Sequence, residues 1–267
     1  MAVVQKLLHS KLGVSITNRC LLSTGHSMNA WMCEEYGKPL IKRQTAIPII
    51  RNQSDVLVKV EAASINPIDV RMSEGYAHEA MTALHRIEER DFTASKPYYR
   101  LPLIGGRDFC GEIGSAVRDF KTGDQVIGVV PAWWQGSHAE YVLSTTDCVA
   151  LKPKTVDSVN AVAMCYTLAT VWSALKMACV PVRNAQNLRV LIHGGSGGIG
   201  TTLIQLLREW NAQKIVATCS ENNLQFVRNI GAIPIDYNAH NAREQLQKEG
   251  PFELILDCAK SPANRMV

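Results

Sequence analysis

A glycine-rich loop near the middle of the C-terminal half carries the clearest chemistry in this sequence. Residues 195–200 read GSGGIG and match the spacing G-x-G-x-x-G. A Val/Leu/Ile strand pattern leads into the loop, a helical pattern leaves it, and a second strand pattern follows. In that context the first glycine allows a tight turn, the second lets a pyrophosphate approach the backbone, and the third lets the helix pack closely on the strand. Free N–H groups at the helix N-terminus then face the pyrophosphate. The loop therefore predicts dinucleotide binding rather than a purely structural turn.

The end of the second strand indicates which dinucleotide is bound. An NAD enzyme usually places Asp or Glu there, on the ribose 2′-hydroxyl. Here the strand ends at Thr218-Cys219-Ser220, and the acid, Glu221, comes one position later. A small hydroxyl residue leaves room for a 2′-phosphate and can hydrogen-bond it, so NADPH is predicted. NADH remains the alternative, with Glu221 on the ribose. Arg228 could add charge, but it is more typical of a solvated helix residue.

Strands and helices alternate around this loop. Asp157 or Ser158 can cap a helix over residues 159–177 that is apolar nearly all round, and we expect it to be buried. The alternation that follows predicts a parallel sheet with right-handed crossovers, a doubly wound Rossmann domain over residues 156–267. Its expected strands cover residues 188–193, 215–220, 233–236 and 252–257, and its expected helices cover residues 198–210, 224–230 and 244–250.

Residues 28–155 are predicted to form a β-rich domain of short strands separated by turns. Residues 55–62 (DVLVKVEA) alternate strictly, as in a strand half buried against a core. An Asn-Pro turn is expected after it, and residues 77–100 are expected to form a polar surface insertion, helical around residues 80–90. Further strands are expected near residues 109–117, 125–130 and 139–142.

Net charge and the N-terminal segment bear on location. The formal charge is +4, and Lys6, Lys11 and Arg19 supply three of those charges, because the first acid is Glu34. No basic stripe remains that would bind nucleic acid.

Residues 1–27 are basic, acid-free and amphipathic, as in a mitochondrial transit peptide, and a frayed extension without a targeting role is the alternative. The apolar runs are shorter than the roughly 18 residues that span a bilayer, so a transmembrane protein is not expected.

Several long segments, in the same order, carry a family resemblance. They are VKVEAASINPIDVRMSEGY, GRDFCGEI, VPAWWQGSHAEYV, TVWSAL, VLIHGGSGGIGTTLIQ, ATCS, IDY and FELILD. The chain resembles the zinc-free quinone oxidoreductase branch of the medium-chain dehydrogenase/reductase superfamily from about residue 28 to residue 257. The resemblance implies an α/β protein with a GroES-like N-terminal domain followed by the Rossmann domain.

The resemblance also assigns candidate site residues. It implies that Ser220 lies at the 2′-phosphate, that Tyr237 lies against the adenosine end, and that Asn66 and Asp69 line the substrate cleft. It further implies that the pyrophosphate is held by Ser196, Gly197, Gly198 and Ile199. Tyr237 could equally be an edge tyrosine packed on the sheet. Asn66 and Asp69 could equally satisfy local backbone groups of a turn.

No metal is expected. Metal-dependent relatives carry a catalytic cysteine near Pro67 and Gly-His-Glu where this chain has Gly106-Arg107-Asp108, so two zinc ligands are lost. The eight cysteines form no Cys-x-x-Cys pair and are expected to be reduced and mostly buried.

The implied activity is metal-free, NADPH-dependent reduction of a quinone or conjugated carbonyl in mitochondria, with a link to coenzyme Q production. No side chain is convincingly the proton donor; Tyr76 or a water are candidates. After Asp257 the family continues with Asn-Val-Gly, whereas this chain reads Cys258-Ala259-Lys260. With four expected strands instead of about six, the Rossmann domain is expected to be incomplete. The alternative function is therefore a catalytically impaired binding or assembly factor, for which the resemblance implies a reticulon-type membrane protein as candidate partner.

Overall fold

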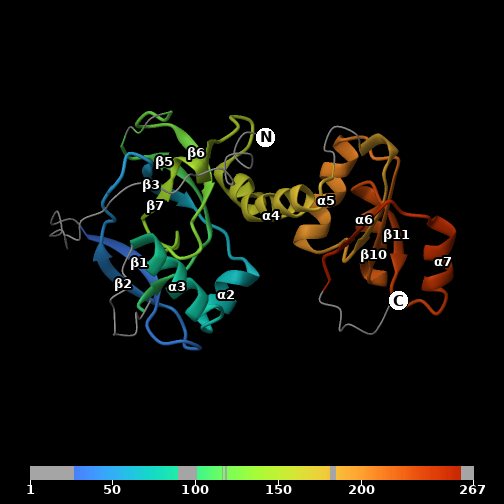
Figure 1. Cartoon of the computed structure of the whole chain (residues 1–267), viewed down its shortest axis with the longest axis horizontal. Coiled ribbons are helices and arrows are strands. Elements are labelled where there is room, and N and C mark those ends of the chain that lie inside the picture. The colour runs from blue at the N-terminus through green and yellow to red at the C-terminus, as the bar shows by residue number, and fades with distance from the viewer. Residues whose placement is uncertain (1–26, 90–100, 116, 118, 181–184, 260–267) are drawn as a thin grey trace. The chain divides into compact units, whose positions relative to one another are not determined.

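The computed structural model describes residues 27–89, 101–115, 117, 119–180 and 185–259 (Figure 1). The proposed transit peptide lies outside these residues, except for Ser27. The chain consists of two compact units, residues 1–166 and residues 167–267, and the boundary between them lies within one helix. The GroES-like and Rossmann regions expected from the sequence fall in the first and second unit respectively. The division lies inside the helix rather than before it at residue 156.

The first unit is built on two antiparallel sheets. One has the order β2-β1-β4 and the other the order β7-β3-β5-β6-β8. The strands are β1 (Ser27–Cys33), β2 (Ile41–Ala46), β3 (Asp55–Ala62), β4 (Leu103–Ile104), β5 (Asp108–Ile113), β6 (Gln125–Val129), β7 (Tyr141–Thr145) and β8 (Val149–Leu151). Alternation in β3 places Val56 and Val58 in a core with Phe109, Ile113 and Val126. The strand expected over residues 55–62 is confirmed.

Two helices follow β3 in this unit. Where an Asn-Pro turn was expected, Asn66 instead caps a short helix, α2 (Pro67–Ser73), with Pro67 in its first turn. Asn at the N-cap and Pro at the first helical position both favour a helix start, so the sequence carried this signal. The expected helix in the insertion is confirmed as α3 (His78–Glu89).

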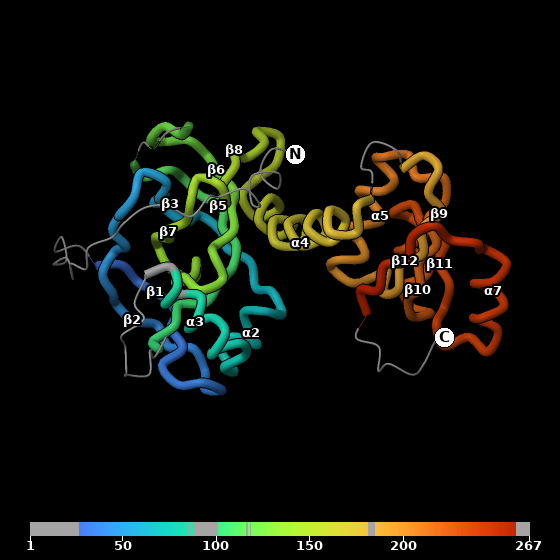
Figure 2. Tube along the Cα trace, viewed as in Figure 1, coloured from blue at the N-terminus to red at the C-terminus, as the bar shows by residue number. Residues whose placement is uncertain are grey.

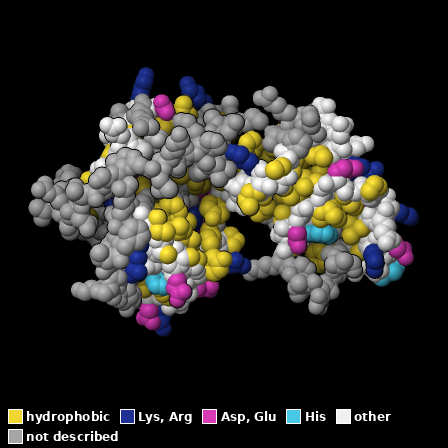
Figure 3. Space-filling view, in the orientation of Figure 1, with side chains coloured by type: hydrophobic (Ala, Val, Ile, Leu, Met, Phe, Trp, Pro, Cys, Tyr) yellow, Lys and Arg dark blue, Asp and Glu magenta, His cyan; other side chains and the backbone are white. Residues whose placement is uncertain are grey.

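Helix α4 (Ser158–Met177) runs from the first unit into the second. Asp157 caps it by accepting the Asn160 N–H at 2.9 Å, as expected. The expectation that α4 is buried all round is wrong: Val162, Val171 and Leu175 are buried, but Val159 and Met177 are 68% and 84% exposed. Apolar side chains at the surface are visible in Figure 3.

The expectation that no apolar run could span a bilayer also needs correction. By length and composition α4 qualifies as a membrane span, the one such helix among the described residues. Core helices of soluble proteins can have the same length and composition. Ala161 and Val162 of α4 pack in one core and Val171 and Leu175 in another, and 22% of its most apolar window is buried.

The second unit is a four-stranded parallel sheet with the order β11-β10-β9-β12 (Figure 2). It contains β9 (Arg189–His193), α5 (Gly198–Glu209), β10 (Lys214–Cys219), α6 (Leu224–Asn229), β11 (Ile233–Asp236), α7 (Ala242–Glu249) and β12 (Leu254–Asp257). Every element expected here from the sequence is present.

Both faces of this sheet are covered by helices. Val190 and Ile192 pack with side chains of α4, α5 and α6, whereas Leu191 packs with Ala242 and Leu246 of α7. Burial on both faces explains the continuous apolar character of β9. The strand order reverses between β9 and β12, which is where doubly wound sheets bind ligands, beyond the carboxyl ends of the strands.

Candidate functional site

The glycine loop joins β9 to α5 at the carboxyl edge of the parallel sheet. Gly194 has φ +83°, a conformation that favours glycine. The Gly195 N–H donates to the Thr218 carbonyl at 2.8 Å, and the Gly197 N–H donates to the Gly194 carbonyl at 3.1 Å. These bonds tie the loop to β10 and turn the chain into α5.

The glycines of the loop serve two different purposes. A Cβ at Gly195 would lie 2.6 Å from the Ala217 Cβ, and one at Gly200 would lie 2.2 Å from the Gly194 carbonyl oxygen. These two positions must be glycine for the loop to close. At Gly197 and Gly198 the nearest atoms to a Cβ would be 3.5 Å away, so the protein itself does not need glycine there. The space they leave lies over the first turn of α5.

The N-terminus of α5 can receive negative charge. Its N-cap is Gly197, which provides no side-chain cap, and its first turn contains no acidic residue. The first N–H groups of a helix have no intrahelical partners and carry the positive end of the helix dipole. Exposed Gly197 and Gly198 with partly exposed Ser196 and Ile199 therefore form a cradle that fits a pyrophosphate.

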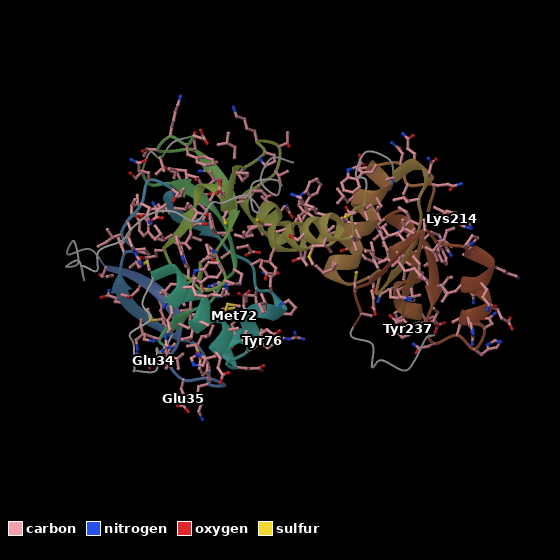
Figure 4. The ribbon with its side chains drawn as sticks, in the orientation of Figure 1. Glu34, Glu35, Met72, Tyr76, Lys214 and Tyr237 are labelled. Carbon is pink, nitrogen blue, oxygen red and sulfur yellow. The ribbon has the colours of Figure 1, made fainter. Side chains whose placement is uncertain are left out.

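Two further predicted cofactor residues lie at the same edge of the sheet. Cys219 of β10 is in register with Asp236 of β11, so Ser220 and Tyr237 follow neighbouring strands. The Tyr237 N–H donates to the Cys219 carbonyl at 3.1 Å. Because the Tyr237 side chain is 47% exposed, its ring is accessible to a ligand and is not packed inside the sheet. Figure 4 labels this residue.

Hydrogen bonding orients the Ser220 hydroxyl. Asn223 Nδ2 donates to Ser220 Oγ at 2.9 Å, which leaves the hydroxyl proton available for an outside acceptor such as a phosphate oxygen. Glu221 is exposed at the start of the following 3₁₀ turn. Arg228 is exposed on α6 and lies 3.5 Å from Gln225 Oε1, consistent with a solvated helix residue.

In the first unit, the predicted cleft residues Asn66 and Asp69 make structural hydrogen bonds. Asp69 Oδ2 accepts the Asn66 N–H at 2.7 Å, and Asp69 Oδ1 accepts the Gly106 N–H at 3.2 Å. Asn66 Nδ2 donates to Ser64 Oγ at 2.9 Å and to Asp108 Oδ2 at 3.1 Å. The bond from the Asn66 N–H is the local backbone bond that the sequence offered as its alternative, whereas Gly106 is 37 residues from Asp69 and Asn66 uses its side chain on other side chains.

These bonds belong to a buried polar cluster that the sequence did not indicate. Arg107 is 2% exposed and Asp108 is fully buried. The Arg107 guanidinium donates at 3.0–3.2 Å to the carbonyls of Pro131, Ala132 and Trp134. Two more Arg107 bonds reach the carbonyls of Gly106 and Ile104.

Asp108 organises the other side of this cluster. Its carboxylate accepts the Ser64 N–H at 2.9 Å and the Ser64 hydroxyl at 2.6 Å. The Ser137 hydroxyl donates to the Asp108 carbonyl, and His138 Nε2 lies 3.0 Å from the Ser64 carbonyl. Arg107 and Asp108 together join three chain segments, residues 64–69, 104–108 and 131–138. Among the described residues, no three His, Cys, Asp or Glu side chains are grouped to hold a metal ion.

The cysteines of the described residues are free thiols. Cys33, Cys110, Cys148 and Cys219 are buried, and Cys179 is exposed. Burial raises the pKa of the Cys165 thiol to about 12 and that of Cys258 to about 11. Such thiols stay protonated at neutral pH and are poor nucleophiles.

Known proteins resemble both units. The family model of the alcohol dehydrogenase GroES-like domain matches residues 52–154. Over 249 residues the chain is 41% identical to reticulon-4-interacting protein 1, mitochondrial, of Caenorhabditis elegans, covering 92% of this chain and 67% of the relative. The chain belongs to the reticulon-4-interacting protein 1 family. The predicted membership of the quinone oxidoreductase branch is thereby confirmed.

Other members of the reticulon-4-interacting protein 1 family support the same assignment. The human relative, named NAD(P)H oxidoreductase RTN4IP1, mitochondrial, is 40% identical over 243 residues, which cover 86% of this chain. The chain spans 59–60% of the length of the human and zebrafish relatives. The quinone oxidoreductase of Coxiella burnetii matches with a TM-score of 0.70 at 29% identity, covering 87% of this chain and 68% of that one.

Proposed function

We propose that this chain is a metal-free, NADPH-dependent oxidoreductase that reduces a quinone or another conjugated carbonyl. The observation that carries the proposal is the open cradle at Gly197 and Gly198, over a helix N-terminus without a side-chain cap. Ser220 and Tyr237 extend it along the same edge of the sheet. Relatives are named as NAD(P)H oxidoreductases, and a 31% identical Arabidopsis thaliana protein is named as an alkenal/one oxidoreductase.

Each part of the cradle has a defined task in this proposal. NADPH, when bound, supplies the hydride. The N–H groups at the start of α5 bind the pyrophosphate, the Ser220 hydroxyl binds the 2′-phosphate, and the Tyr237 ring covers the adenosine. The protein contributes binding and orientation, since the redox chemistry belongs to the cofactor.

NADPH turnover with a panel of quinones and alkenals tests the proposed activity. We expect the purified chain to oxidise NADPH only when an acceptor is present. If protein that has been shown to bind NADPH reduces none of the acceptors, this result contradicts the proposed activity. It would favour the second candidate, a binding or assembly factor, for which the name of the Caenorhabditis elegans relative suggests a reticulon-type partner.

Replacing Ser220 with aspartate is expected to reverse the cofactor preference. A carboxylate at the end of β10 repels a 2′-phosphate but accepts the two ribose hydroxyls of NADH. Titration of both dinucleotides against tryptophan fluorescence should show NADPH binding weakened by about 100-fold, or about 2.7 kcal/mol. Asn229→Asp, which adds the same charge at the C-terminal end of α6, is the control. Equal affinity of the wild type for NADPH and NADH would contradict a 2′-phosphate contact at Ser220.

The mitochondrial location rests on the acid-free segment of residues 1–27 and on the mitochondrial relatives. Quinone reduction there would be compatible with a role in coenzyme Q production. We expect removal of the segment on import, so that the mitochondrial protein begins near residues 27–30. N-terminal sequencing of protein isolated from mitochondria checks this expectation, and an intact Met1 would contradict it.

A further inference from the structure

Thr218, near the end of β10, binds both residues with which the glycine loop begins. Its side-chain oxygen Oγ1 accepts the Gly194 N–H at 3.3 Å, and its carbonyl accepts the Gly195 N–H at 2.8 Å. Thr218 is only 2% exposed, so water competes little for these two bonds. Since β9 and β10 are neighbours in the sheet (Figure 2), Thr218 lies beside the point where the loop leaves β9.

The start of the loop needs such bonds because its own backbone does not favour one path. Glycine has the largest conformational freedom of all residues, and Gly194 is held at φ +83°. The position of Gly194 also reaches the cradle, because its carbonyl accepts the Gly197 N–H at 3.1 Å. Gly197 is the N-cap of α5. The Thr218 hydroxyl is thus linked to the cradle through Gly194.

His193 directs the Thr218 hydroxyl. The two residues are in register on neighbouring strands, and His193 Nδ1 lies 3.2 Å from Thr218 Oγ1. The Gly194 N–H can only donate, so the hydroxyl oxygen accepts on that side, and its single proton is left for His193 Nδ1. This arrangement requires a neutral imidazole that carries its own proton on Nε2. His193 then turns a lone pair of the hydroxyl toward Gly194.

We propose that Thr218 and His193 are positioning residues for the dinucleotide; this inference rests on the proposed function, of which it needs only the NADPH-binding step. Both side chains act through Gly194 and not by contact with the cofactor. They hold the glycine loop in the geometry that receives the pyrophosphate before NADPH arrives. A loop that is already ordered loses less conformational freedom on binding, and affinity rises accordingly.

Thr218→Val tests the hydroxyl, because valine keeps the branched shape and removes only the hydrogen-bonding group. We expect the Kd for NADPH to rise by about tenfold, or about 1.4 kcal/mol, the effect of one lost hydrogen bond. Thr218→Ser, which retains the hydroxyl, should bind NADPH nearly as tightly as the wild type. Thr146→Val removes the hydroxyl of a threonine of the first unit that is 5% exposed, and as the control it should leave the Kd unchanged. Isothermal titration calorimetry measures all four proteins.

A fragment of the cofactor separates positioning from a general structural defect. Adenosine 2′-monophosphate carries the adenosine and the 2′-phosphate but no pyrophosphate. In the proposed site it can contact Ser220 and Tyr237 but not the cradle at Gly197. Thr218→Val should therefore weaken the binding of NADPH and leave that of adenosine 2′-monophosphate unchanged, whereas a disordered sheet edge would weaken both.

His193 is tested by a pair of variants of similar size. In His193→Asn the side-chain oxygen can replace Nδ1 as the acceptor of the Thr218 proton, and in His193→Leu no acceptor remains. We expect the leucine variant to lose NADPH affinity and the asparagine variant to retain most of it. Nitrogen-15 NMR of the wild-type imidazole should show the neutral form with its proton on Nε2.

Several results would overturn the positioning role. They are an unchanged NADPH affinity in Thr218→Val, an equal loss for NADPH and adenosine 2′-monophosphate, and a wild type that binds no NADPH. If Thr218→Val does not fold, the two His193 variants decide, and equal NADPH affinities in these two would overturn the role. A wild type that binds NADPH in this Thr218-dependent manner but reduces no acceptor would support the positioning role and contradict the proposed oxidoreductase activity.

Discussion

Replacing Gly197 with alanine is expected to weaken dinucleotide binding strongly and to leave the stability of the chain nearly unchanged. The backbone at Gly197 has φ −79° and ψ 168°, which alanine adopts without strain, and the nearest atom to its Cβ would be 3.5 Å away. The added methyl group would instead occupy the space through which a pyrophosphate approaches the first turn of α5. We expect NADPH affinity to fall by about 100-fold, or about 2.7 kcal/mol.

Two other glycines make this experiment specific. Gly200→Ala would place a Cβ 2.2 Å from the Gly194 carbonyl oxygen, so we expect loss of both binding and stability. A Cβ at Gly114, in the first unit, would have the Leu57 carbonyl oxygen as its nearest atom at 3.5 Å, and Gly114→Ala should change neither property. Fluorescence titration and thermal unfolding of the three variants separate the effects. NADPH binding by Gly197→Ala within about threefold of wild type would contradict the cradle.

The parallel sheet could be predicted from the sequence because most residues of its two central strands are buried. β9 and β10 are buried on both faces, and each strand is followed at once by loop residues and a helical pattern. The predicted strand over residues 188–193 and the observed Arg189–His193 differ by one residue. Ser220 and Tyr237 each directly follow a strand, so the same regularity brings them to one edge of the sheet.

The first unit was predicted less completely. Five of the six residues of β2 are exposed, so this strand shows no alternation that a sequence pattern could reveal. β1 does alternate, with Met28, Ala30 and Met32 buried, but it begins at the last residue of the proposed leader. For α2, the capping signals at Asn66 and Pro67 were present, but seven residues are too few for a clear helical period.

The buried polar cluster could not be predicted because its partners are distant in the sequence. The Arg107 bonds to Pro131, Ala132 and Trp134 span 24–27 residues, and Ser64 is 44 residues from Asp108. The sequence showed only that zinc ligands are missing at residues 106–108. What replaces them depends on which carbonyl groups the fold brings to the guanidinium.

Replacing Arg107 with leucine is expected to lower the free energy of unfolding by about 3–5 kcal/mol, the range seen when a buried charge partner is removed. The substitution leaves the carbonyls of Pro131, Ala132 and Trp134 without their donor. It also removes a buried positive charge from the chain segment that holds the buried Asp108. Urea unfolding followed by circular dichroism measures the change.

Arg43→Leu is the matched control for this stability measurement. Arg43 pairs with Glu34 at 2.8 Å on the surface, with about half of its side chain exposed, and exposed pairs contribute little to stability. Arg107→Lys should recover only part of the loss, because an ammonium offers three donors on a point charge instead of a planar fork. If Arg107→Leu unfolded at the same urea concentration as Arg43→Leu, the three carbonyl bonds from Arg107 to the 131–134 segment would not stabilise the fold.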